Sequence, residues 1–204
     1  MAPMPPPEER VLRAVGARRR APGRPTVPEI VRTLREFAQP DAPIVALFDA
    51  DAIAGERHLL SAWAHLGRSR SRGESRLRDR AAELALYVAG DDQLPRALAK
   101  VGASDATERF VLVVERPLEP ASLLDRFGLD ADPTAYPRPV SEPLLDRLGI
   151  PAAERAVVPP AQWEGLVLER VALVDLTAPA THGGTPKALT TGTGRRPAAD
   201  GRQA

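Results

Sequence analysis

The sequence predicts an α+β fold, in which helices pack on a small mixed sheet to make a single domain of two layers. Short runs rich in β-branched residues predict the strands, and residues 110–114 are the clearest of them. Between these runs, apolar residues recur three and four positions apart, which is the spacing of helices with one buried face. The chain has 204 residues, and we expect residues 10–176 to form the domain, because this length can bury a substantial core.

The two ends of the chain differ in composition from the rest. Residues 1–9 are rich in proline, and residues 177–204 consist largely of glycine, threonine, proline and arginine with few apolar side chains. Segments of this composition cannot bury enough apolar surface to fold. We therefore predict disordered tails at 1–9 and 177–204.

Composition also excludes several kinds of chemistry. The chain has no cysteine, so it forms no disulfides and no cysteine-ligated metal site. The formal net charge is +1, so contact with RNA needs a local basic patch rather than a general excess of cations. The chain shows neither the apolar core of a signal peptide nor an apolar run of about 20 residues, and we expect a cytoplasmic protein with no membrane partner.

Two strands and a helix are expected before residue 50. Residues 11–15 alternate loosely between apolar and polar, which fits an edge strand. Thr26 fits the N-cap of a helix, and Pro28 fits its first turn. Residues 44–48 are apolar and lie between prolines and aspartates, as expected for a buried strand.

Three helices are expected in the middle of the chain. The apolar residues of 55–67 and of 77–88 each fall on one helical face. Gly90 suits the left-handed residue that follows a helix. Asp91 or Asp92 then caps a further short helix.

The last third of the chain begins with the strand at 110–114. From residue 161 onward, apolar residues recur at helical spacing, although their β-branched side chains also fit a strand. We expect, besides these, helices at 120–127 and 141–148, a loop at 128–139 and a short edge strand at 156–158.

No catalytic or metal-binding pattern stands out. His58 and His65 are seven residues apart on one predicted helix, hence about 10 Å apart along its axis, which is too far for one metal ion. Ser61 and His65 can touch, but a helical serine lacks the strained turn and oxyanion donors that acyl transfer requires. The sequence therefore predicts no catalytic residue, no metal and no cofactor.

An arginine-rich segment, residues 68–80, connects two of the predicted helices. It contains six arginines, opposed by Glu74 and Asp79 alone. Guanidinium groups bind phosphates in pairs of hydrogen bonds and stack on bases, so the segment predicts a contact with single-stranded RNA. A solvated loop in an arginine-biased chain is the alternative. The candidate RNA-binding residues are His65, Arg68, Arg70, Arg72, Arg76, Arg78 and Arg80.

The last predicted helix has apolar residues on more than one face. Leu168 and Leu173 lie off the main apolar stripe. Such a helix is either deeply buried or half-buried with a partner covering the rest. The candidate partner-binding residues are Leu166, Val167, Arg170, Val171 and Val174, with simple core burial as the alternative.

Several short motifs follow one another between residues 48 and 102. They are Phe48-Asp49-Ala50, His58-Leu59-Leu60, Ala62-x-x-His65-x-x-Arg68, Arg72-Gly73-Glu74, Glu83-Leu-x-Leu-Tyr87-x-Ala-Gly90, and Gln93-Leu94 before Gly102. In order and spacing, this set resembles the kinase-binding subunit of the KEOPS complex, the TPRKB or PRPK-binding protein family, in its archaeal type. Two positions depart from the pattern: Asp91 and Asp92 stand where archaeal relatives usually carry basic residues, and Arg70 stands where an aromatic residue is common.

The resemblance implies a small α+β domain that acts as a non-catalytic subunit. It implies that the chain binds the KEOPS kinase/ATPase subunit, reaches the other KEOPS subunits indirectly, and helps recruit tRNA through its 3′ CCA end for threonylcarbamoyladenosine modification. Because Asp91 and Asp92 would repel a phosphate, a module that binds the kinase without touching RNA is an alternative. An uncharacterised small enzyme is a further alternative.

Overall fold

The computed structural model describes residues 11–39 and 42–177. The tail predicted at 1–9 lies outside the described residues, as does the tail predicted at 177–204 apart from Thr177, which ends the last helix. No helix in the described part of the chain is long and apolar enough to cross a membrane.

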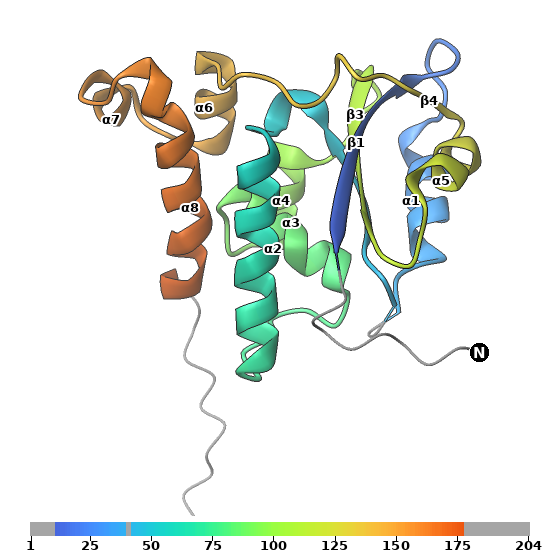
Figure 1. Ribbon diagram of the computed structural model, residues 1–204, viewed down its shortest axis with the longest axis horizontal. Coiled ribbons are helices and arrows are strands. Elements are labelled where there is room, and N and C mark those ends of the chain that lie inside the picture. Colours follow the sequence, from blue (N-terminus) through green and yellow to red (C-terminus); the bar gives the residue numbers. More distant parts are fainter. Residues whose placement is uncertain (1–10, 40–41, 178–204) are drawn as a thin grey trace, which may run out of the picture.

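The strands form one four-stranded sheet in the order β2-β3-β1-β4. Each strand runs antiparallel to its neighbours, and the sheet is seen nearly edge-on in Figure 1. The strands are β1 (Leu12–Arg19), β2 (Val45–Asp49), β3 (Arg109–Glu115) and β4 (Leu129–Ala131).

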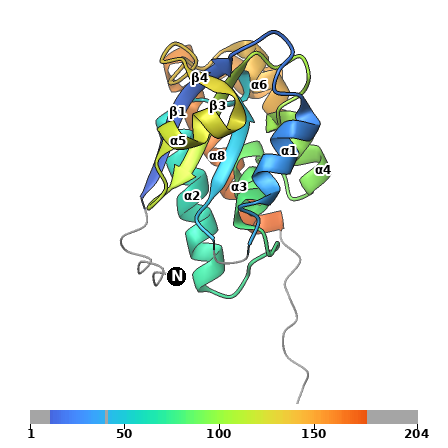
Figure 2. The same ribbon diagram turned by 90° about the vertical axis from the view of Figure 1, so that its right-hand side faces the viewer.

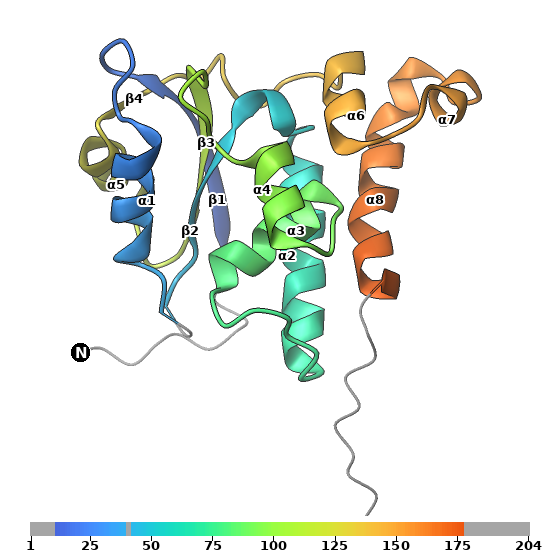
Figure 3. The ribbon, with the colours of Figure 1, turned by 180° about the vertical axis from the view of Figure 1, so that it is seen from behind.

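Helices cover both faces of this sheet. Helices α1 and α5 lie on one face, and α2, α3 and α4 lie on the other, with α8 farther out against α2 and α3 (Figures 1 and 3). Figure 2 shows α1 and α5 from the front. The helices are α1 (Val27–Arg35), α2 (Glu56–Ser71), α3 (Arg80–Ala89), α4 (Leu94–Val101), α5 (Pro120–Phe127), α6 (Glu142–Leu148), α7 (Ala152–Ala156) and α8 (Trp163–Thr177), with 3-10 turns η2 (Ala50–Ala52) and η3 (Pro160–Gln162).

Strand β3 separates two apolar cores. Its residues Val111 and Val113 face the core of α2, α3 and α8, whereas Phe110, Leu112 and Val114 face the core of α1 and α5. All five side chains are buried. A strand that is apolar at every position is the pattern expected when both faces of a sheet are covered.

The predicted α+β class and single domain are confirmed, with two corrections to the arrangement. The sheet is antiparallel rather than mixed. It lies between helices rather than under one layer of them, because β2 and β3 expose apolar side chains toward both faces. The domain therefore has at least three layers where two were predicted.

Several helices agree with the prediction in type and position. The helix predicted at 120–127 has those bounds, and the last segment is a helix rather than a strand. Gly90 takes the left-handed conformation after α3, with φ of 59°, and a Cβ there would lie 2.8 Å from the Cβ of Arg170. This close approach lets α8 pack on the end of α3.

Three details of the prediction are wrong, and a fourth holds for only part of its strand. The first half of β1 lies at an edge of the sheet, as predicted for residues 11–15, because among the described residues β4 pairs only with Ala17–Arg19. The predicted loop at 128–139 contains β4. Residues 156–158 form the end of α7 and a turn instead of a strand. Helix α4 is capped by Gln93, and the Asp91 carboxylate accepts a hydrogen bond from the Gln93 amide instead.

Candidate docking surface at the arginine-rich segment

The arginine-rich segment and the C-terminal end of α8 meet at one end of the helical layer. The arginine-rich segment runs from the last turns of α2 to the first residue of α3, and α8 packs against both helices. The C-terminal ends of α2 and α8 point the same way in Figures 1 and 3. The Arg76 guanidinium donates to the Val174 carbonyl oxygen, so the segment is bonded directly to α8.

Arg80 is a core residue, and its prediction as an RNA-binding residue is wrong. Its side chain is 9% exposed and donates to both carboxylate oxygens of Glu115, at 2.6 and 2.8 Å. It also donates to the Ala42 carbonyl at 3.2 Å. This buried pair joins α3 to β3, and no phosphate can reach it.

Arg70 is neutralised by a buried carboxylate. Glu83 on α3 has no exposed surface, and it accepts hydrogen bonds from Arg70 at 2.9 Å, Ser75 at 2.8 Å and the Arg76 amide at 2.8 Å. These bonds hold the loop between α2 and α3 against the start of α3. A glutamate that satisfies several donors in a low-dielectric site is costly to replace.

His65 belongs to a cluster that joins three helices. The carboxylate of Asp175 on α8 bonds the His65 Nδ1 at 2.6 Å and accepts from the Tyr87 hydroxyl at 2.9 Å. The His65 and Tyr87 rings stack with centroids 5.9 Å apart, and the Arg76 guanidinium lies 6.0 Å from the Tyr87 ring centroid. Burial alone would raise the pKa of Asp175, but the bonds from His65 and Tyr87 hold that pKa below its usual value.

The cations that remain available face solvent. Arg68 and Arg78 are exposed and form no ion pair with another described residue. Arg72 is about half exposed and bonds Glu74 at 2.7 Å. Of the predicted RNA-binding arginines these are the exposed ones, whereas Arg70 and Arg76 are partly buried.

Most of the predicted partner-binding residues are buried inside the domain. Leu166, Val167, Val171 and Val174 all pack in the core shared with α2 and α3, so they cannot contact a partner while the chain is folded. Arg170 donates to Glu154 at 2.6 Å. The alternative of core burial holds for the four apolar residues.

The outward face of α8 carries exposed apolar residues. Leu173, which lies off the main apolar stripe of the sequence, is 43% exposed, and Leu176 is 79% exposed. The stripe itself is the buried side of the helix, so the partner-binding residues were chosen from the wrong face. Exposed leucines on a helix that borders free arginines are suited to contact with another macromolecule.

Asp91 and Asp92 form ion pairs with both cationic side chains of α4, Arg96 and Lys100. Asp91 bonds Arg96 at 3.0 Å and Lys100 at 3.1 Å, and Asp92 bonds Arg96 at 2.8 Å. Although burial raises the pKa of Asp91, hydrogen bonds from Gln93, Lys100 and Arg96 lower it below the usual value. The start of α4 is therefore not a cationic site.

His58 has a structural role. Its ring is fully buried, accepting from the Ala54 amide at 3.1 Å and donating to the Val88 carbonyl at 2.9 Å. Burial lowers its pKa to about 4, so the ring is neutral at physiological pH. Among the described residues, no group of three or more histidines and carboxylates is placed to hold a metal ion.

Comparisons with known proteins add no assignment for this surface. No protein-family model matches the chain, and no curated protein matches it.

Proposed function

We propose that this protein is a non-catalytic subunit of a KEOPS complex in the cytoplasm. It binds the KEOPS kinase/ATPase subunit, helps recruit tRNA through the 3′ CCA end, and so contributes to threonylcarbamoyladenosine modification without turning over a substrate. The observation that supports this proposal is that exposed leucines on α8 lie near exposed arginines, at the end of α2 and before α3, that form no ion pair with another described residue. Apolar anchors suit a protein partner, and free guanidinium groups suit a nucleic acid.

Contact with the kinase subunit is carried by the outward face of α8. The anchors of this interface are Leu173 and Leu176 instead of the buried residues predicted from the sequence, because only exposed side chains can be covered by a partner. The motifs that resemble the KEOPS family support this role from the sequence side. Several of their members hold the helical layer together, among them His58, Glu83, Tyr87 and Gly90.

Co-purification with the kinase subunit tests the protein interface. The double variant Leu173→Glu/Leu176→Glu should fold normally, as judged by circular dichroism, and fail to co-elute with the tagged kinase. Val157→Glu is a matched control, since Val157 is 81% exposed and lies outside α8. Retention of the double variant by the kinase, or equal loss of the control, would reject this interface.

Binding to tRNA tests the second part of the proposal. A gel shift should show tighter binding of intact tRNA than of the same tRNA lacking its CCA end. Equal binding of the two, with the kinase still bound, would reject recognition of the CCA end. No tRNA binding at all would favour the interaction module without RNA contact, which the pairing of Asp91 and Asp92 with Arg96 supports.

A further inference from the structure

The first half of β1 lacks a neighbouring strand on the side away from β3. Strand β4 pairs only with Ala17–Arg19, and the chain then leaves the sheet after the Asp132 amide donates to the Gly16 carbonyl at 2.9 Å. The departing loop crosses Gly16 so closely that a Cβ there would lie 2.2 Å from the Asp132 carbonyl oxygen. In the part of the chain that the structure describes, no strand pairs with Leu12–Val15 on this side.

The register shows which backbone groups face this open edge. The Arg19 amide donates to the Glu108 carbonyl on the β3 side, so the odd-numbered residues of β1 bond to β3. The amides and carbonyls of Leu12 and Ala14 therefore point away from β3. Backbone groups exposed along a strand edge are a template for the addition of another strand.

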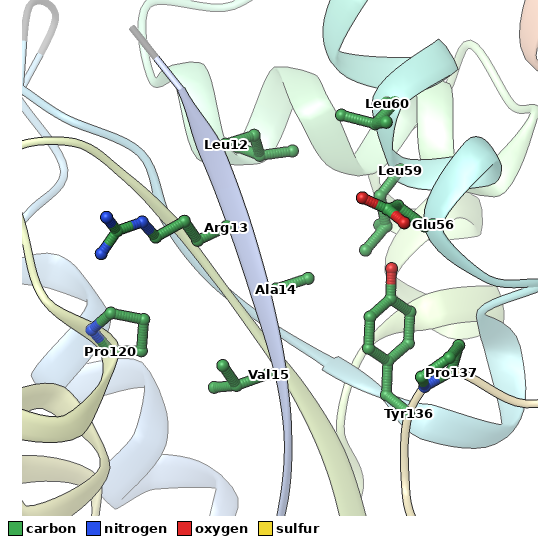
Figure 4. A pocket seen from close by; sticks show the side chains of 10 residues that line it. All are labelled: Leu12, Arg13, Ala14, Val15, Glu56, Leu59, Leu60, Pro120, Tyr136 and Pro137. Carbon is green, nitrogen blue, oxygen red and sulfur yellow. The ribbon is translucent and has the colours of Figure 1, made fainter. Parts of the chain in front are cut away.

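A groove of about 510 Å³ runs along this edge, within the range of ligand sites (Figure 4). Helix α2 contributes Leu59 and Leu60 to one wall, and Leu60 is 41% exposed. Pro120 of α5 lies on the other side of β1, and Tyr136 and Pro137 border the groove. The walls are thus mainly apolar, with a backbone edge between them.

The groove also carries an uncompensated negative charge. Glu56 on the first turn of α2 forms no ion pair with another described residue, whereas Arg13 is paired with Glu119 at 2.7 Å. In Figure 4 the Tyr136 hydroxyl points toward Glu56, and it has no hydrogen-bond partner among the described residues. Burial, and then the charge of Glu56, raises the pKa of Tyr136 to about 12, so the hydroxyl keeps its proton.

We propose that this groove binds an extended peptide segment of a partner protein, which adds to β1 as a strand beside Leu12–Val15 and directs a basic side chain toward Glu56. The outward backbone groups of Leu12 and Ala14 pair with the peptide backbone, and alternate peptide side chains lie against Leu60 and Pro120. The charge of Glu56 selects a lysine or arginine in the peptide. This site lies apart from the arginine-rich segment and does not depend on the function proposed above.

Selection from a phage-displayed library of short random peptides tests the proposal. Ala14→Pro removes an amide that faces the open edge without removing a bond to β3, a substitution that strand edges tolerate. The wild-type chain should enrich peptides with alternating apolar residues and a lysine or arginine. Those peptides should bind Ala14→Pro about tenfold more weakly, the effect of losing one backbone hydrogen bond.

Two further measurements test the proposal even if Ala14→Pro folds poorly. Methylating alternate backbone amides of an enriched peptide should abolish its binding to the wild-type chain, and Glu56→Gln should weaken binding of basic peptides but not of neutral ones. Absence of enrichment, or equal binding of methylated and unmethylated peptides, would overturn the proposal. A wild-type dimer that Ala14→Pro dissociates would assign the edge to a second copy of the chain and would overturn it as well.

Discussion

Five of the six arginines of residues 68–80 fall into two groups that share a sequence context but not an environment, and the sixth, Arg72, is half exposed and bonds Glu74. Arg70, Arg76 and Arg80 turn inward, where they meet Glu83, the Val174 carbonyl and Glu115. Arg68 and Arg78 stay exposed, without an ion pair to another described residue. The number of arginines in a segment therefore overestimates how many can bind a partner, because some of them form bonds inside the domain.

The inward group fixes geometry more than it adds net stability. Taking two charges out of water costs several kcal/mol per ion, so an intact buried pair contributes little overall. Removing one partner is different, because the other charge stays buried and loses the opposite charge that it faced. The comparison predicts large effects for the inward residues and small effects on stability for the outward ones.

The largest effect is expected for Arg80→Ala. It removes the guanidinium that bonds both carboxylate oxygens of Glu115 in the core, and the free energy of unfolding should fall by about 3–5 kcal/mol. Arg78→Ala is the matched control and should change it by no more than about 0.5 kcal/mol. Urea unfolding of both variants checks the difference, and similar values for the two would break the distinction between the groups.

Of the two histidines of α2, His58 is the one whose burial predicts a pH dependence of stability. The pKa of His58 is about 4 in the folded chain, against an ordinary value of 6.5, so the unfolded chain takes up a proton first as the pH falls. Stability should therefore be constant above about pH 6.5 and decline toward pH 4, losing about 3 kcal/mol in all. Urea midpoints across this range measure it. His65→Gln should keep this decline, and a flat profile in the wild-type chain would exclude a buried neutral His58.

A smaller loss is expected for Glu83→Gln. The amide keeps the shape of the side chain but removes the charge that Arg70 faces, and its N–H groups confront the donors of Ser75 and Arg76. The free energy of unfolding should fall by about 1–3 kcal/mol. The exposed Glu74→Gln should cost no more than about 0.5 kcal/mol. Hydrogen exchange of the loop amides would show whether the loss is local.

The sequence predicted the elements whose signals are local. Strand β3, helix α5 and the glycine at the end of α3 were placed by apolar runs and by residue types with strong backbone preferences. Strand β4 was missed because it is three residues long and carries one buried apolar side chain, Leu129, which is too short a pattern to predict a strand. Residues 11–15 were assigned to an edge, but the groove along that edge could not be anticipated, because its walls come from α2, from Pro120 and from the loop that follows β4.

The candidate site was predicted less well, for a related reason. Whether an arginine points inward depends on partners distant in sequence: Glu83 lies 13 residues from Arg70, and Glu115 lies 35 from Arg80. On α8, the candidate partner-binding residues were taken from the stripe that the core buries, whereas Leu173, which lies off that stripe, is exposed. Leu176 could be identified only after the packing against α2 and α3 was known.

The salt dependence of tRNA binding tests the outward group most directly. Each phosphate contact to a single strand contributes about −0.7 to the slope of log affinity against log salt, so Arg68→Ala/Arg78→Ala should make the slope about 1.4 shallower than in the wild-type chain. Arg32→Ala/Arg35→Ala on α1 removes the same charge from an exposed site elsewhere and should leave the slope unchanged. Equal slopes and affinities for the wild-type chain and Arg68→Ala/Arg78→Ala would contradict the assignment of these arginines to tRNA.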